Sequence, residues 1–198
     1  KKFIERLNIF WKLLNKTPNV CNTMIIEINS FHSGYYSLVS FKSNLSHYVY
    51  AVASKVAYDP NNINLRRKYF ESEIKIGMLN DNPIYVILVR YRKLKDGSIE
   101  RYFIFSFRGT QPTNLSDIKS DLNILINNKE NDERFKYCLK AVENFINIPK
   151  YKNSYIVLTG HSLGGSIAMY IADKLSLPCI VFNPGSSIEF NINLDHKK

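Results

Sequence analysis

Along this chain, some segments place their apolar residues at helical spacing and others at the spacing of an extended strand. Over residues 3–14 the apolar side chains recur at helical spacing and basic side chains fill much of the remaining surface. The pattern predicts an amphipathic helix that ends before Thr17-Pro18. This helix either packs against the domain or rests on a lipid interface. A second helix is predicted over residues 46–58, where Asp59-Pro60 stops it.

Two extended segments follow, over residues 83–91 and 101–107, on either side of Asp96-Gly97. An Asp-Gly pair between such segments is a strong hairpin signal. The second segment is almost continuously apolar, which predicts a strand buried on both faces.

The downstream pattern predicts a helix, a strand, a glycine-rich turn, a helix and a strand. Their ranges are 135–146, 155–159, 160–165, 167–175 and 179–182. Short apolar strands joined by helices form right-handed parallel units. We therefore expect an α/β fold with a mostly parallel sheet and flanking helices.

Composition limits the function classes. With 198 residues and 45% hydrophobic content, one domain over 1–198 is expected, with 1–40 as an N-terminal helical extension. The net charge of +10 fits either an anionic membrane surface or a chain-wide preference for Lys. Because no basic run is present, nucleic-acid binding is not expected.

The cysteines and the chain ends give little information about function or localisation. Cys21, Cys138 and Cys179 lack zinc-ligand spacing and are expected to be core thiols, so neither a disulfide nor a metal is implied. No run is long enough to span a membrane. The chain starts at Lys1 without Met, so an upstream segment could have been removed, and localisation and oligomeric state stay open.

The segment Gly160-His161-Ser162-Leu163-Gly164-Gly165 is the strongest chemical signal. A serine between a strand and a helix, with glycines two positions before and after it, is typical of a nucleophile elbow. Ser162 would attack, and the Leu163 N–H at the helix start would stabilise the oxyanion. The alternative is that Ser162 only caps the helix.

Three successive motifs resemble those of class 3 lipases, the fungal-lipase-like α/β-hydrolases. They are Phe107-Arg108-Gly109-Thr110, residues 116–122 and the glycine-rich turn at residues 160–165. Further similarity lies in Ala57-Tyr58 and in residues 179–186, so the resemblance covers residues 48–185.

The resemblance implies roles for several residues. Thr110 would give its backbone N–H to the oxyanion hole, and Asp121 would orient the Thr110 hydroxyl, with Asp117 as the alternative. His161 would support the elbow together with Gly160 and Gly164, and no cofactor is implied.

The acid and the histidine of a catalytic triad cannot be assigned. The carboxylates and histidines considered are Asp173, Glu189, Asp195, His196, His32 and His47. Three explanations stay open: the chain is an excerpt that is incomplete on its C-terminal side, it is a degenerate enzyme, or it borrows residues from another chain. The excerpt is favoured, since a sheet ending after residues 179–182 would expose an unpaired edge.

The expected function is ester hydrolysis through an acyl-enzyme on Ser162, with triacylglycerol or phospholipid as substrate. A membrane or lipid-droplet interface is the candidate surface. The alternative is a catalytically silent lipase-like domain that binds lipid or protein, and a weaker alternative is thioester or peptide cleavage.

Overall fold

The computed structural model describes residues 45–71, 74–110, 128, 130–182 and 184, together with three short strands between residues 25 and 36. The expected helix at residues 3–14 lies outside this part of the chain, as do Cys21, Asp117, Asp121 and His196.

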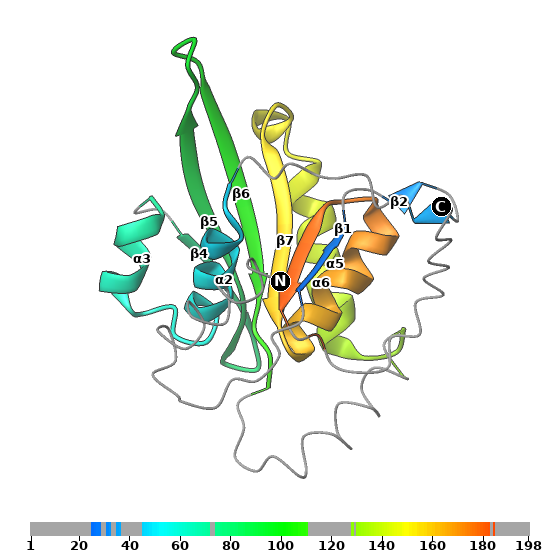
Figure 1. Cartoon of the computed structure of the whole chain (residues 1–198). Coiled ribbons are helices and arrows are strands. Elements are labelled where there is room, and N and C mark those ends of the chain that lie inside the picture. The colour runs from blue at the N-terminus through cyan, green and yellow to red at the C-terminus, as the bar shows by residue number, and fades with distance from the viewer. Residues whose placement is uncertain are drawn as a thin grey trace.

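One mixed sheet forms the centre of the described structure (Figure 1). Its order is β1 (Ile25–Ile28), β8 (Cys179–Phe182), β7 (Tyr155–His161), β6 (Ile99–Phe107), β5 (Asn82–Lys93) and β4 (Ile74–Leu79). Strands β7 and β8 are parallel, as predicted from the strand-helix pattern, and β6 is parallel to β7 as well. Strand β4 points the same way, whereas β1 and β5 run against it. The sheet is therefore mostly but not purely parallel.

Two hairpins build the β4 side of the sheet. The predicted β5–β6 hairpin is confirmed, and Gly97 takes a positive φ of 86° in its turn. A second hairpin joins β4 to β5, where Asn80 and Asp81 both have positive φ values, 48° and 61°. Such a pair of left-handed residues matches the right-handed twist of the flanking strands. The sequence analysis missed β4, because its turn carries Asn-Asp rather than the stronger Asn-Gly or Asp-Gly pair.

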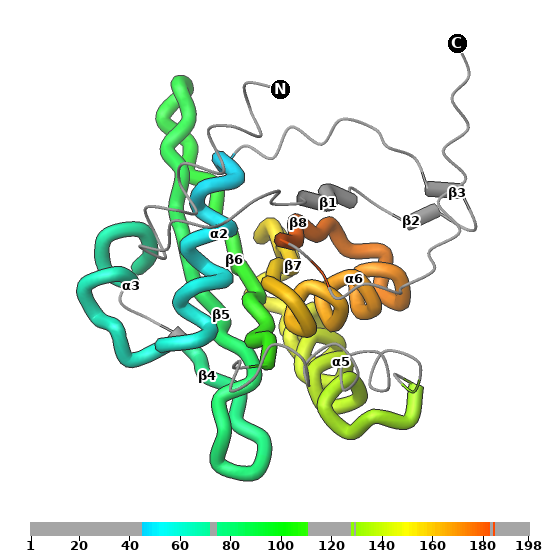
Figure 2. The backbone as a smooth tube through the Cα atoms, turned by 60° about the horizontal axis from the view of Figure 1, so that its bottom comes forward, coloured from blue at the N-terminus to red at the C-terminus, as the bar shows by residue number. Residues whose placement is uncertain are grey.

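Helices cover both faces of the sheet (Figure 2). Helix α2 (His47–Val56) lies on one face, and α5 (Glu133–Ile146) and α6 (Leu163–Leu175) lie on the other. A shorter helix, α3 (Ile63–Tyr69), and a 3-10 turn (Pro149–Tyr151) were not predicted. Helix α6 begins four residues before the expected position, since its first turn contains Gly164 and Gly165, which hide the apolar pattern.

Strand β6 shows how the two cores form. Phe103, Phe105 and Phe107 pack on the side of α5 and α6, and Tyr102 and Ile104 pack on the side of α2. All five side chains are buried, which confirms the prediction of burial on both faces. The side chains of Cys138 and Cys179 are also fully buried, as expected of core thiols.

The prediction of an unpaired sheet edge beside β8 is wrong. Strand β1 pairs with it in antiparallel register, from Ile25 opposite Phe182 to Ile28 opposite Cys179. This strand, together with β2 (Phe31–His32) and β3 (Tyr35–Tyr36), lies within residues 1–40, where we expected a helical extension. The error has a physical cause, because a four-residue strand completed by a partner more than 150 positions away carries no local signal.

Among the described helices, none has the length and apolar character needed to cross a bilayer.

Candidate active site

The backbone at Ser162 has an unusual conformation. Ser162 lies between β7 and α6 with φ 55° and ψ −128°, outside the regions that residues with a side chain normally occupy. Its N–H donates to the carbonyl of Phe182 in β8 at 3.2 Å, which ties the turn to the neighbouring strand. The Ser162 side chain makes no capping hydrogen bond to α6. The hydroxyl is therefore not used as a helix cap, contrary to the alternative weighed from the sequence.

Close backbone approaches explain the glycines of this turn. A Cβ on Gly160 would overlap the carbonyl group of Gly164, and a Cβ on Gly164 would overlap the carbonyl oxygen of Phe107. The start of α6 thus lies directly against the end of β6. Any larger residue at position 164 would push these two elements apart.

The loop after β6 lies beside the turn at Ser162. Arg108, Gly109 and Thr110 follow the last residue of β6, and a Cβ on Gly109 would meet the carbonyl oxygen of His161. Thr110 is half-buried at this edge. Leu163 is the first residue of α6, so its N–H has no acceptor within the helix. The carboxyl ends of β6 and β7 thus bring Thr110 and Leu163 to the same edge of the sheet as Ser162.

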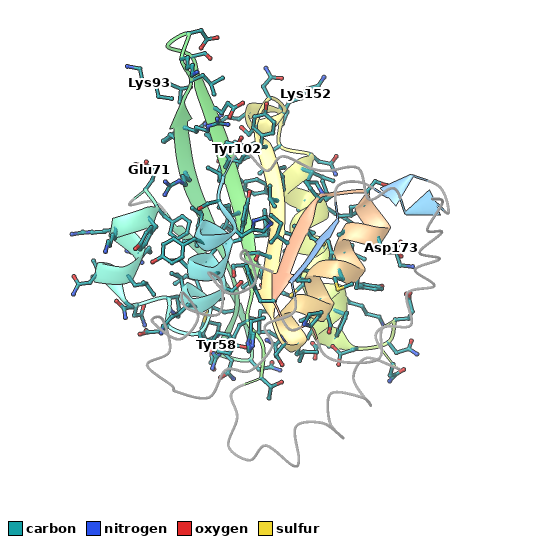
Figure 3. The ribbon with its side chains drawn as sticks, in the orientation of Figure 1. Tyr58, Glu71, Lys93, Tyr102, Lys152 and Asp173 are labelled. Atoms are coloured by element: carbon teal, nitrogen blue, oxygen red, sulfur yellow. The ribbon has the colours of Figure 1, made fainter. Side chains whose placement is uncertain are left out.

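Tyr58 connects the loop after β6 to the turn at Ser162. It follows α2, and Figure 3 places it at the end of the sheet where β6 and β7 finish. Its hydroxyl lies 3.1 Å from Nδ1 of His161 and 3.4 Å from the carbonyl oxygen of the same residue. A Cβ on Gly109 would overlap the same hydroxyl, so the loop after β6 packs directly against Tyr58. The Tyr58 O–H can donate to His161.

Burial sets the protonation states of this pair. Loss of solvent raises the pKa of Tyr58 to about 12, although the Gly109 N–H and the cations Arg134 and Arg108 oppose the shift. Loss of solvent lowers the pKa of His161 to about 4. At neutral pH both groups are uncharged. A Tyr58 hydroxyl that donates to Nδ1 selects the His161 tautomer with its proton on Nε2.

Two arginines flank the loop after β6. The Arg108 N–H donates to the carbonyl of Ile84 at 2.9 Å, and its Nη1 donates to that of Pro83 at 3.2 Å. Arg134, the second residue of α5, donates from Nη2 to the carbonyl of Arg108. Burial lowers the pKa of Arg134 from its ordinary value, and the Arg108 charge lowers it further. The sequence analysis missed Arg134, because only the apolar positions of its helix carried a signal.

Two of the residues weighed for a triad lie far from Ser162. His47 is the first residue of α2, and Tyr58 lies beyond the other end of that helix. The two are eleven positions apart, which corresponds to about 16 Å of helical rise. Asp173 is exposed near the end of α6, more than two turns from Ser162 (Figure 3). Asp121, Asp117, Glu189, Asp195 and His196 lie outside the described residues, and so does the His32 side chain.

No group of three or more His, Cys, Asp or Glu residues within the described part of the chain could hold a metal ion.

Comparison with known protein families supports the resemblance noted from the motifs. Residues 82–177 match the family described as lipase (class 3). Neither the curated proteins nor the solved structures gave a match to the chain. The matched stretch is just under half of the 198 residues and runs from β5 to the end of α6, so it includes the loop after β6 and the turn at Ser162. Over residues 82–177 this chain is therefore similar to the class 3 lipases, a family of lipase-like hydrolases with the α/β-hydrolase fold.

Proposed function

We propose that the protein hydrolyses carboxylic esters through an acyl-enzyme on Ser162, with triacylglycerols or phospholipids as the substrate class. The observation that carries the proposal is the backbone of Ser162, held at φ 55° and ψ −128° between β7 and α6 with its hydroxyl free of any capping bond. A strained conformation of this kind persists only where surrounding contacts enforce it, and it is common at catalytic sites.

The reaction would follow the usual order of acyl transfer. The Ser162 oxygen attacks the ester carbonyl carbon while a histidine base takes its proton. The carbonyl electrons move to the oxygen, which accepts hydrogen bonds from the N–H groups of Thr110 and Leu163. The alcohol then leaves with a proton, and water hydrolyses the acyl-serine by the same steps. This proposal retains Asp121 as the residue that orients Thr110.

His161 is proposed as a support of the turn and not as the base. Its lowered pKa disfavours proton uptake near neutral pH, and its Nδ1 is occupied by the Tyr58 hydroxyl. The histidine base and its acid partner would come from outside the described residues.

A fluorophosphonate probe tests the proposal directly, because it traps an activated serine as a stable covalent adduct. The full chain should be labelled at Ser162, as located by peptide mass spectrometry, and Ser162→Ala should abolish the labelling. Ser176→Ala is a matched control, since Ser176 also has a positive φ, 52°, at the opposite end of α6. The control should be labelled like the wild type. A folded wild-type chain that takes up no probe would overturn the proposal in favour of a catalytically silent binding domain.

Substrate class needs a second measurement. Emulsified triacylglycerol, phospholipid vesicles, p-nitrophenyl esters of several chain lengths and peptides should be compared with the same protein. We expect turnover of the acyl esters and none of the peptides. Turnover of peptides alone would exclude the lipase assignment.

A further inference from the structure

Arg134 contacts the site from an element that the proposed chemistry does not use. Helix α5 begins with Asp132 as its cap, whose carboxylate accepts the N–H groups of Arg134 at 2.9 Å and Phe135 at 3.1 Å. The Phe135 side chain is fully buried under α6. Both contacts fix the backbone from which the Arg134 side chain extends. Its guanidinium then crosses to the end of β6, where it donates to the carbonyl of Arg108.

That hydrogen bond restrains one peptide group at the start of the loop. The peptide between Arg108 and Gly109 accepts Arg134 at its carbonyl, and the Arg108 N–H of the preceding peptide donates to the carbonyl of Ile84. Gly109 is closely packed as well, because a Cβ there would overlap the Tyr58 hydroxyl and the carbonyl oxygen of His161. These contacts restrict the backbone that leads to the Thr110 N–H.

Arg134 also brings positive charge to the loop. Its side chain is half-buried, and its Nε has no partner in the described structure. The described residues include no carboxylate that forms an ion pair with Arg108 or Arg134. A guanidinium stays protonated throughout the physiological pH range. Its charge lies beside the loop that would receive negative charge during ester attack, where a positive charge favours the oxyanion.

We propose that Arg134 is a positioning residue for the oxyanion hole and acts through the Arg108 carbonyl. It holds the Thr110 N–H toward the developing oxyanion, so it favours the transition state over the bound substrate. This role rests on the proposed function of Ser162. It is distinct from that function, because a serine hydrolase does not need an arginine on the helix before its nucleophile.

The test separates transition-state effects from substrate binding. Arg134→Met keeps a long apolar side chain and removes the hydrogen-bond donor and the charge. With a p-nitrophenyl ester we expect kcat to fall about 10-fold to 100-fold, which is less than the fall caused by removing a direct oxyanion donor. KM should change little. Arg134→Lys keeps the charge and one donor and should recover part of kcat. Lys136→Met is the matched control, since Lys136 is exposed on the same helix; its kinetics should equal those of the wild type.

The outcomes distinguish this inference from the proposed function. Wild-type protein that is not labelled at Ser162 overturns both. Wild-type labelling together with an unchanged kcat in Arg134→Met overturns the positioning role alone. A rise in KM at constant kcat also overturns it, because Arg134 would then act in substrate binding. If Arg134→Met unfolds, Arg134→Gln measured below its Tm replaces it, with the same expectation for kcat.

Discussion

At Ser162 and its neighbours, single residues are held in conformations or protonation states that they would not favour in water. Ser162 has a positive φ, and His161 is kept uncharged by burial. Its Nδ1 lies 3.1 Å from the hydroxyl of Tyr58, whose own pKa is raised to about 12. Tertiary contacts stabilise each of these states.

The state of His161 makes stability depend on pH. Its pKa is about 4 in the folded protein and about 6.5 in the unfolded chain. Between these values the unfolded state binds more protons, so the free energy of unfolding falls as the pH falls from 6.5 to 4. The full effect would be on the order of 3 kcal/mol. Urea denaturation at several pH values measures it.

His161→Asn is the matched variant for this experiment. Asparagine keeps an acceptor near the position of Nδ1 and cannot titrate. We expect the stability of the variant to vary less between pH 6.5 and pH 4 than that of the wild type. Equal slopes for the two proteins would show that His161 is not kept neutral by burial.

At the scale of the elements, the close contact of α6 with the end of β6 requires that residue 164 carry no side chain. A Cβ on Gly164 would overlap the Phe107 carbonyl oxygen, whereas a Cβ on Gly165 would approach the Pro184 Cα only to 3.2 Å. Both glycines lie in the first turn of α6 and gain the same helix propensity on substitution by alanine.

Gly164→Ala should therefore destabilise the protein by about 1 to 3 kcal/mol, the usual cost of overpacking. Gly165→Ala should cost clearly less. Thermal denaturation followed by circular dichroism compares the two variants. If Gly165→Ala lowers the Tm as much as Gly164→Ala, the approach of α6 to β6 is not the limiting contact.

Across the whole molecule, β1 determines whether the sheet has an open strand beside the site. It covers β8, whose Phe182 carbonyl also binds the Ser162 N–H. Edge strands with free N–H and C=O groups promote aggregation. The pairing of residues 25–28 with 179–182 thus protects the strand that supports the turn at Ser162.

Proline at Ile26 should remove this protection, because proline cannot donate a hydrogen bond and disfavours pairing. We expect Ile26→Pro to lower the Tm and to increase light scattering on mild heating. Ile26→Val, which retains the backbone N–H and suits a strand, is the control. Wild-type behaviour of Ile26→Pro would mean that the β1 pairing contributes little to stability.

Local sequence patterns were sufficient for part of this structure. The Asp-Gly turn, the apolar run of β6 and the helical spacing of α5 each follow from neighbouring residues, and they predicted elements that the structure confirms. The elbow motif placed Ser162 between a strand and a helix for the same reason.

Tertiary structure decided the rest. Strand β1, the hydrogen bond from Arg134 to the Arg108 carbonyl and the lowered pKa of His161 each require residues far apart in sequence to meet. Burial and long-range pairing depend on the complete fold, so periodicity along the chain cannot specify them. The sequence by itself determined the order of the central elements and the identity of the candidate nucleophile, while the fold alone determined which side chains hold that nucleophile and its neighbouring loop in place.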